Sequence, residues 1–405
     1  MIKKIVIWGA GNQGREAYYH LRGRYEVAGF YDSDLTKAGR EIVDGKQVLP
    51  YRRHEFYIVV ACGKWMEVVR NLQEEGLAVQ DDFLPYHMLE RKSLRLHDMI
   101  ECMGAEGIKK YLDAVRRTRQ VALVYGNCQT EIIANMLEYN KDFHNRYALL
   151  RVPQIHLYTD ENQIKEIFYH NRLMEKIDLF IYQNVKEENR FHPLLGAARI
   201  IGQMEAGCKK LCIHNIYFDG YFIQYDADEN RYFANMNQKD FPYTDGIVHE
   251  LIAEGKNIDE IIEMINDTDF IPSKTVLEKC EKSIENLRQR EEKVDVPIVD
   301  YIEKHYREEQ LFYTYNHPKN IVIYEYVKRI LKAVGISSAD EFTEEELNLA
   351  FGTLRINNFP VFPCVISALG LKKYERKVRI SHISTGLITM NEYIREYIVR
   401  CYGVG

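Results

Sequence analysis

Apolar runs alternate with helix-like segments at the start of the chain. Residues 3–8, 25–31 and 56–61 are mainly apolar and predict three buried strands. Amphipathic segments that begin at glycines follow the first and third runs and are typical of helices. Strands that alternate with helices favour a parallel sheet with right-handed crossovers. We therefore predict an α/β domain over residues 1–87, followed by a helical connector at residues 88–120.

The same alternation starts again at Val121 and predicts a second α/β domain that extends to residue 335. A fifth strand is expected at residues 310–318, and the first four are expected at residues 121–126, 146–152, 178–183 and 209–215. In open parallel sheets, ligands bind at the carboxyl ends of the strands. We therefore expect the ligand-binding and catalytic residues to lie in the loops that follow these runs.

The pattern is mainly helical from Asp245 onward, and residues 336–405 are expected to form a helical C-terminal extension. Residues 273–295 are rich in charge and predict a long helix. A solvated face is the commoner explanation of such a segment, and an arm that packs against a partner is the alternative. The predicted fold class is α/β, with an N-terminal parallel sheet domain and a second α/β domain whose C-terminal part is largely helical.

Composition places the chain among globular proteins. Its 405 residues are too many for one core, and hydrophobic and aromatic contents of 46% and 12% are those of a folded protein. A net charge of -6 argues against a general nucleic-acid binder. The first apolar run is too short for a signal peptide, and no run is long enough for a membrane span. Eight scattered cysteines favour free thiols in a reducing cytoplasm. We expect a cytoplasmic protein without nucleic-acid partners or membrane insertion, and its oligomeric state stays open.

Three glycines directly after the first strand form a G-x-G-x-x-G pattern: Gly9, Gly11 and Gly14. Asp32 lies at the end of the second strand. In Rossmann-type domains such glycines let a diphosphate approach a helix N-terminus, and the acid binds a ribose. The pattern predicts that these four residues bind NAD or another nucleotide. The alternative is a domain that keeps the pattern around an empty or altered site.

The segment "VYGNCQT" places Cys128 at a turn from a strand into a helix. A helix N-terminus stabilises a thiolate and would lower the pKa of this thiol. The amides of Asn127 and Gln129 could donate hydrogen bonds to a developing oxyanion. These features predict a reactive or oxyanion-stabilising cysteine. The alternative is a small buried cysteine in a tight turn.

A cysteine nucleophile requires a base, and His317 is the strongest candidate. It lies in "YTYNHP" after a strand-like run, between Asn316 and a proline. This places it at the same kind of sheet edge as Cys128. The alternative is a histidine that caps the next helix.

Residues 213–225, "IHNIYFDGYFIQY", gather aromatic residues around Gly220. In a loop, this stretch would offer an aromatic wall to a sugar or an adenine ring, formed by Tyr217, Phe218, Tyr221, Phe222 and Tyr225. The alternative is an ordered loop that covers the core.

Two further patterns are weaker. Cys208, Cys212 and His214 are spaced somewhat like metal ligands but lack a fourth ligand, so we expect no metal site. Tyr324 and Lys328 match the Tyr-x-x-x-Lys pair of short-chain dehydrogenases. They lie far from the glycine pattern in a predicted helix of another domain, so chance is the better explanation.

Four stretches, in this order, resemble the WcbI-type polysaccharide biosynthesis proteins, which include capsule acetyltransferases that bind coenzyme A. They are "YGNCQ", "DLFIYQ" with Gln183, "IYFDGYF" and "NHP". The resemblance covers roughly residues 121–334 and departs from the family at Ile223 and Gln224, where a proline and an acid are usual. If that loop contacts the acceptor, the acceptor differs.

The resemblance implies transfer of an acyl group, such as acetyl, from acetyl-coenzyme A to a sugar or polysaccharide precursor. Cys128 and His317 would carry the chemistry, either through an acyl-cysteine or by direct attack of a sugar hydroxyl. The other candidates for substrate or oxyanion binding are Asn127, Gln129, Gln183, Tyr217, Gly220, Tyr221 and Asn316. The sequence names no third, orienting residue.

Two other classes of function remain at this stage. One is an enzyme that modifies sugars with NAD or a nucleotide sugar, built on the first domain. The other is a non-catalytic subunit of a glycan assembly complex that senses a nucleotide.

Overall fold

The structure is a computed structural model that describes residues 4–22, 25–78, 81–86, 94–225, 241, 243–337, 339, 341–351, 353–355, 358–380 and 387–403. The expected domain boundary at residues 87–88 lies outside the described residues. The chain divides into two compact units. The first unit comprises residues 1–125, 141–180 and 186–209, and the second comprises residues 126–140, 181–185 and 210–405.

A parallel sheet with the order β2-β1-β5-β6 forms the N-terminal part of the first unit. Its strands are β1 (Lys4–Trp8), β2 (Glu26–Tyr31), β5 (Tyr57–Val60) and β6 (Phe83–Pro85). The prediction of a parallel α/β domain is confirmed. β6 and the small hairpin of β3 (Glu41–Val43) and β4 (Lys46–Gln47) were not predicted.

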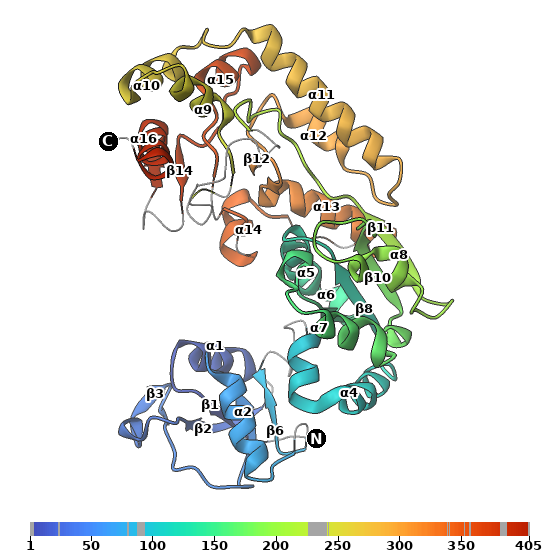
Figure 1. Cartoon of the computed structure of the whole chain (residues 1–405). Coiled ribbons are helices and arrows are strands. Elements are labelled where there is room, and N and C mark those ends of the chain that lie inside the picture. The colour runs from blue at the N-terminus through green and yellow to red at the C-terminus, as the bar shows by residue number, and fades with distance from the viewer. Residues whose placement is uncertain are drawn as a thin grey trace. The chain divides into compact units, whose positions relative to one another are not determined.

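Alternating side chains of β1 pack on the two faces of this sheet, because successive residues of a strand point to opposite sides. Ile5 and Ile7 share one core cluster with residues of α1 (Asn12–Leu21). Val6 lies in a second cluster with residues of α2 (Trp65–Glu74). The sheet therefore has a helix on each face, as in doubly wound folds (Figure 1).

A second sheet has the strand order β11-β10-β8-β9-β7. Its strands are β7 (Leu94–Arg95), β8 (Gln120–Tyr125), β9 (Tyr147–Arg151), β10 (Leu179–Gln183) and β11 (Lys209–Ile213). Both β8 and β7 pair with β9 in parallel. The chain proceeds from β8 to β9 on one side and then returns to β10 on the other. The loops after β8 and β10 therefore flank the point where the strand order reverses, which is the usual ligand position in such sheets.

The fifth strand of this sheet is not the one that the sequence predicted. Residues 312–314 form β12, which pairs only with β13 (His317–Pro318) in an antiparallel hairpin. The fifth position is taken by β7, which precedes α4 (Leu96–Val115) in the segment expected to be a helical connector. A strand of two residues is too short to give an alternating pattern, which is why the sequence did not reveal it.

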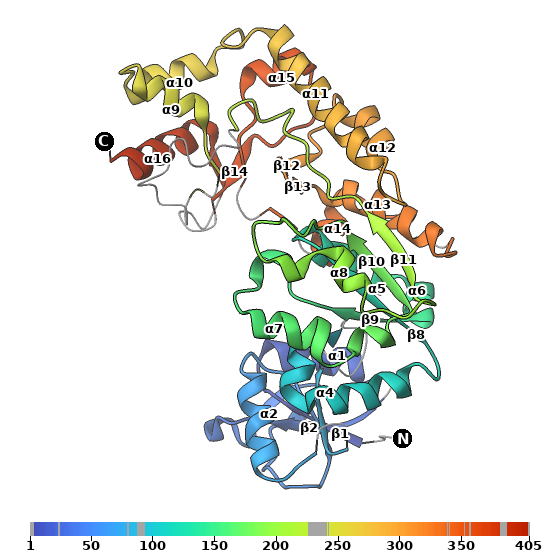
Figure 2. The same ribbon diagram turned by 45° about the vertical axis from the view of Figure 1, so that its right-hand side comes forward.

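Helices accompany the second sheet and form most of the remaining chain (Figures 1 and 2). Those between its strands are α5 (Gln129–Tyr139), α6 (Lys141–Arg146), α7 (Glu161–Lys165) with a π-helical turn (Glu166–His170), and α8 (Ala197–Ile201). Single 3-10 turns are at Leu35–Lys37, Ile155–Leu157, Leu173–Lys176 and Pro193–Leu195.

The C-terminal part is largely helical, as predicted. Its helices are α9 (Gly246–Ala253), α10 (Ile258–Asn266), α11 (Ser273–Glu291), α12 (Val299–His305), α13 (Asn320–Ala333), α14 (Glu344–Phe351), α15 (Pro363–Leu369) and α16 (Met390–Tyr402). A second hairpin is formed by β14 (Lys377–Arg379) and β15 (Leu387–Thr389). The predicted charge-rich helix is α11, and its buried residues include Val276, Cys280 and Leu287.

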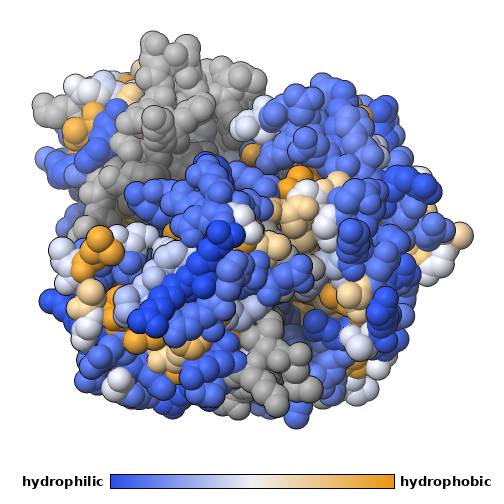
Figure 3. Space-filling model, turned by 90° about the horizontal axis from the view of Figure 1, so that it is seen from below, coloured by the Kyte–Doolittle hydropathy of each residue, from blue (hydrophilic) through white to orange (hydrophobic). Residues whose placement is uncertain are grey.

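The described residues contain no helix that is long and apolar enough to cross a membrane. On the face drawn in Figure 3, hydrophilic residues dominate and the hydrophobic ones lie in small, separate groups. Isolated apolar residues of this kind are normal on a protein surface.

Asp245 is expected to make the stability of the protein depend on pH. This N-cap of α9 is fully buried: its Oδ1 accepts a hydrogen bond from the Val248 N–H at 2.9 Å, and its Oδ2 has no hydrogen-bond partner among the described residues. Burial raises the pKa of this carboxyl to about 7. Because the folded-state pKa lies above that of the unfolded chain, the stabilisation is present in acid and is lost as the pH rises towards 7.

The matched variant Asp245→Asn keeps an oxygen for the cap but does not titrate. Relative to this variant, the wild type should lose about 2 kcal/mol of unfolding free energy between pH 5 and pH 7. Urea unfolding of both proteins across this range measures the difference. A difference in unfolding free energy between the two proteins that stays constant from pH 5 to pH 7 would show that Asp245 does not titrate in this range.

Candidate functional site

The turn after β8 is held by Gln183, the last residue of β10. Its Oε1 accepts a hydrogen bond from the Asn127 N–H at 2.8 Å, and its side chain is buried. A Cβ at Gly126 would lie only 2.4 Å from this oxygen, so only glycine allows the approach. Gln183 therefore positions the turn from within the protein, whereas we had predicted that it would contact substrate.

Gln129, the first residue of α5, joins the turn to two other segments. Its Nε2 donates to the carbonyl oxygens of Ile216 at 2.7 Å and Asn316 at 2.9 Å, and its Oε1 accepts from the Ile216 N–H at 3.1 Å. The side chain is almost fully buried. These bonds connect the Cys128 turn to the "IYFDGYF" and "NHP" stretches, which lie far apart in the sequence. They also use the amide that we expected to face an oxyanion.

Asn127 is likewise bound within the protein. Its Nδ2 donates to Asn215 Oδ1 at 2.8 Å, and its Oδ1 accepts from the Gln129 N–H at 3.0 Å. Among the described residues, the Cys128 N–H has no acceptor other than its own thiol. The backbone N–H of Cys128 could therefore donate a hydrogen bond to an oxyanion, whereas the side-chain amides of Asn127 and Gln129 are used within the protein.

Cys128 is half-buried, while the residues on both sides of it are buried. Burial raises the pKa of its thiol to about 11, although the N–H groups of Cys128 and Gln129 act in the opposite direction. The sequence-based expectation of a lowered pKa is therefore wrong. Loss of water around the thiolate outweighs the helix N-terminus, so the cysteine is protonated at neutral pH.

The raised pKa predicts how Cys128 reacts with iodoacetamide. Only the thiolate attacks, so the alkylation rate should rise about tenfold per pH unit from pH 7 to pH 10. Peptide mapping of the alkylated protein measures this rate, with glutathione as the reference thiol. A rate that levels off by pH 8 would instead reveal a thiolate stabilised in the free protein.

The segment that carries His317 is held by Tyr243, a residue that sequence reasoning missed. The Tyr243 hydroxyl donates to Asn316 Oδ1 at 3.0 Å, and the Thr314 hydroxyl donates to the same oxygen at 2.8 Å. The Tyr243 and His317 rings meet edge to face with centroids 6.3 Å apart. Asn316 and His317 are half-buried, as is Cys128.

The pKa of Tyr243 also depends on the charge of Cys128. Burial raises the pKa of the Tyr243 hydroxyl, and negative charge on Cys128 raises it further. Tyr243 therefore contacts His317 directly, whereas Cys128 affects it only through the charge of the thiolate form. No motif surrounds Tyr243 in the sequence, and only the folded chain brings it to this position.

The aromatic stretch divides into a core part and an open part. Tyr221 is fully buried, and its hydroxyl donates to the carbonyls of Tyr306 and Glu309 at 2.7 and 3.0 Å. Gly220 packs so tightly that a Cβ there would lie 3.0 Å from Cys280 Cα. These contacts correct the expectation that Tyr221 and Gly220 bind substrate, because neither has a face left for a ligand.

Tyr217 belongs to the open part. It is half-buried and stacks on Tyr315 with ring centroids 5.7 Å apart, and Tyr315 stacks on Tyr225 at 4.0 Å. Two of the predicted residues, Tyr217 and Tyr225, therefore do stack in an aromatic wall, and Tyr315 from a second segment lies between them. Gln224, where the sequence departs from the family pattern, is buried and donates to the Pro360 carbonyl at 2.7 Å. In this chain, the Gln224 hydrogen bond connects the aromatic loop to the C-terminal extension.

The N-terminal glycines differ in what they contact. A Cβ at Gly14 would lie 1.7 Å from Gly9 O, so this glycine is required for helix packing. Gly11 has open space around its Cβ position. Asp32 Oδ2 accepts from the Ala10 N–H at 2.8 Å and from Lys37 Nζ at 3.0 Å, so this carboxylate closes the glycine turn within the protein.

The remaining patterns have structural explanations. The two ring nitrogens of His214 face the carbonyls of Asn215 and Leu287, and Tyr324 is buried. The part of the chain that the structure describes contains no group of three or more His, Cys, Asp or Glu residues that could hold a metal ion.

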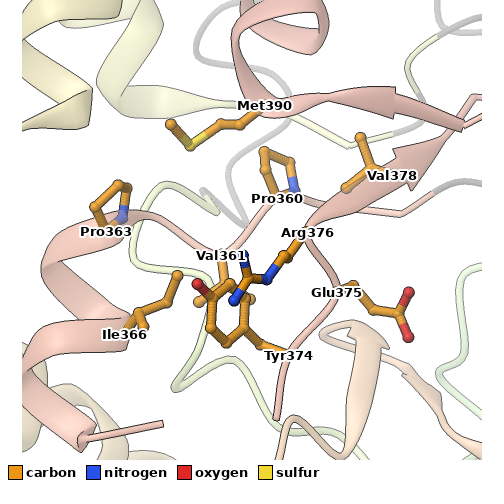
Figure 4. Close-up of a pocket in the computed structure, with 9 residues that line it drawn as sticks. All are labelled: Pro360, Val361, Pro363, Ile366, Tyr374, Glu375, Arg376, Val378 and Met390. Carbon is orange, nitrogen blue, oxygen red and sulfur yellow. The ribbon is translucent and has the colours of Figure 1, made fainter. Parts of the chain in front are cut away.

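A pocket of about 190 Å³ lies between α15, β14 and the start of α16 (Figure 4). Its lining is mainly apolar, with Tyr374 and Arg376 in contact with each other and Glu375 directed away. It includes none of the residues that the sequence singled out, and it therefore lies outside the candidate site.

Comparison with known proteins gives two matches. The family model described as "Polysaccharide biosynthesis enzyme WcbI" matches residues 121–339, slightly more than half of the chain. A solved structure of WcbI, described as a novel polysaccharide biosynthesis enzyme, is similar with a TM-score of 0.57 and 20% identity, over 69% of this chain and 88% of that chain. It is described as the native protein without a disulfide bond between coenzyme A and one of its cysteines. No curated protein matches the chain.

Proposed function

Because the chain belongs to the WcbI family of polysaccharide biosynthesis enzymes, we propose that it transfers an acyl group, such as acetyl, from acyl-coenzyme A to a sugar hydroxyl during assembly of a surface polysaccharide. The observation that carries this proposal is the bond from Gln129 Nε2 to Asn316 O at 2.9 Å, which joins the turn of Cys128 to the segment of His317. The coenzyme A mentioned for the related structure supports the choice of donor.

Cys128 is the proposed nucleophile and His317 the proposed base. Cys128 Sγ attacks the thioester carbonyl while His317 accepts the thiol proton, and the Cys128 N–H donates to the oxyanion. The bond from the acyl carbon to the coenzyme A sulfur then breaks, and His317 returns the proton to that sulfur. One thioester replaces another, so this half-reaction is close to isoenergetic.

The second half-reaction mirrors the first. A sugar hydroxyl attacks the acyl-cysteine, and His317 accepts the hydroxyl proton. The bond to Cys128 Sγ breaks, and His317 gives the proton back to the thiol. The products are the sugar ester and free coenzyme A. Because the pKa of the Cys128 thiol is about 11, the thiol does not ionise by itself at neutral pH, and the base is needed in both halves.

Calorimetry and thermal-shift measurements with coenzyme A, acetyl-coenzyme A, NAD and nucleotide sugars test the choice of donor. The proposal expects micromolar-range binding of coenzyme A and acetyl-coenzyme A, and stabilisation of the protein by both. Binding of NAD or a nucleotide sugar without any response to coenzyme A at millimolar concentration would favour a sugar-modifying enzyme or a nucleotide sensor.

We also propose that the N-terminal domain binds a nucleotide, because the Cβ position of Gly11 has open space around it. The Asp32 carboxylate adds no support, since it binds Ala10 and Lys37 within the protein. Gly11 is the N-cap of α1 and lies at the edge between β1 and β5, where the strand order of this sheet reverses. A valine there should fit the fold and block a diphosphate.

Gly11→Val should therefore leave the melting temperature within a few degrees of the wild type and weaken NAD or nucleotide binding at least about tenfold. Gly14→Val, by contrast, should destabilise the domain because its side chain would meet Gly9 O. Calorimetry that detects no nucleotide binding by the wild type would make this domain structural.

A further inference from the structure

Arg290, near the C-terminal end of α11, is a half-buried cation whose hydrogen-bond acceptors among the described residues are all backbone carbonyls. Its Nε donates to Asn286 O at 3.2 Å, and its two terminal nitrogens donate to Asn215 O at 3.4 Å and Tyr217 O at 3.1 Å. A guanidinium has five N–H groups, so two have no acceptor within the part of the chain that the structure describes. Asp219, the acid whose charge acts on the pKa of Arg290, is paired with Lys279 at 3.8 Å.

The charge of Arg290 is not needed for these contacts. A neutral amide could also donate to backbone carbonyls, whereas a buried charge without a carboxylate carries a desolvation cost. Burial accordingly lowers the pKa of Arg290. The charge is therefore better explained by an anion that binds from outside the chain.

The position of Arg290 connects it to the candidate site. Its guanidinium lies over the Tyr217 ring, 5.3 Å from the centroid, at one end of the stack formed with Tyr315. Asn215, whose carbonyl accepts from Arg290, also accepts the side-chain hydrogen bond of Asn127. A single residue thus separates this cation from the turn that carries Cys128.

We propose that Arg290 and Tyr217 bind the phosphate-bearing end of the acyl donor. This inference rests on the proposed function, since coenzyme A carries phosphate groups and an adenine ring at the end opposite its thiol. The free N–H groups of Arg290 suit phosphate oxygens, because charge-assisted bonds from arginine to phosphate are among the strongest hydrogen bonds in proteins. Tyr217 supplies the aromatic surface beside them.

Calorimetry of Arg290→Gln with coenzyme A and with pantetheine, which lacks the phosphates, tests the proposal. The Kd for coenzyme A should increase about 10- to 100-fold, while the Kd for pantetheine stays within about twofold. Arg288→Gln is the matched control, because it removes the same charge from an exposed position of α11 where Arg288 pairs with Glu285 and Glu303. Arg290→Lys, which keeps the charge, should lose less than about tenfold.

Each other outcome overturns the proposal in a recognisable way. Equal weakening of coenzyme A and pantetheine would show that Arg290 only shapes the loop at Asn215 and Tyr217. Unchanged coenzyme A binding by Arg290→Gln would exclude the phosphate contact and leave the proposed function intact. Failure of the wild type to bind coenzyme A would instead contradict the proposed function.

Discussion

Replacing Cys128 with alanine should reduce acyl transfer by roughly 1,000-fold or more, while the Kd for coenzyme A stays within several-fold of the wild type. The variant lacks the proposed nucleophile, and the alanine keeps the backbone N–H that would donate to the oxyanion. Steady-state release of coenzyme A, together with calorimetry, separates the loss of chemistry from any loss of binding.

The control for this experiment is Cys401→Ala, another half-buried cysteine, which lies in α16. It should retain near-normal rates. Acyl transfer by Cys128→Ala at a rate close to wild type would show that the sugar hydroxyl attacks the thioester directly. Cys128 would then be a packing residue of the turn.

Replacing His317 with alanine should lower kcat by about 100- to 10,000-fold, the usual contribution of a positioned general base. The effect should be near the upper end, because burial raises the pKa of the Cys128 thiol to about 11 and the thiol cannot ionise unaided at neutral pH. For the same reason, the residual activity of the variant should rise with pH as hydroxide replaces the base. A pH–rate profile of both proteins measures this.

His305→Ala is the matched control, since His305 is a half-buried histidine at the end of α12 that faces Glu308. Its activity should be close to that of the wild type. A His317→Ala variant whose rate falls by less than about threefold, with the pH profile unchanged, would assign the base to another residue.

Features that depend on local pattern were predictable from the sequence. The strands that carry the glycine turn and Cys128 are continuous apolar runs, and the helices after them have clear starting signals. The fold class and the family resemblance are confirmed. The two-residue strands β7 and β13 could not be predicted, because they are too short to give an alternating pattern.

The candidate site shows the same division. The sequence located Cys128 and His317 at turns. It could not show that burial, which raises the pKa of the thiol, outweighs the helix N-terminus, which lowers it. Nor could it show that the side chains of Asn127, Gln129 and Gln183 form hydrogen bonds within the protein instead of facing a ligand. The burial of Tyr221 in the core was equally hidden. Tyr243 and Arg290 were missed because their importance comes from contacts between residues far apart in the chain.

Intact-protein mass spectrometry after incubation with acetyl-coenzyme A, without an acceptor, tests the central claim most directly. The account predicts an increase in mass of one acetyl group that peptide mapping assigns to Cys128 and that hydroxylamine removes. The adduct should be absent from Cys128→Ala and should form far more slowly in His317→Ala. An unmodified Cys128 in a protein that binds acetyl-coenzyme A and acetylates a sugar would contradict the account.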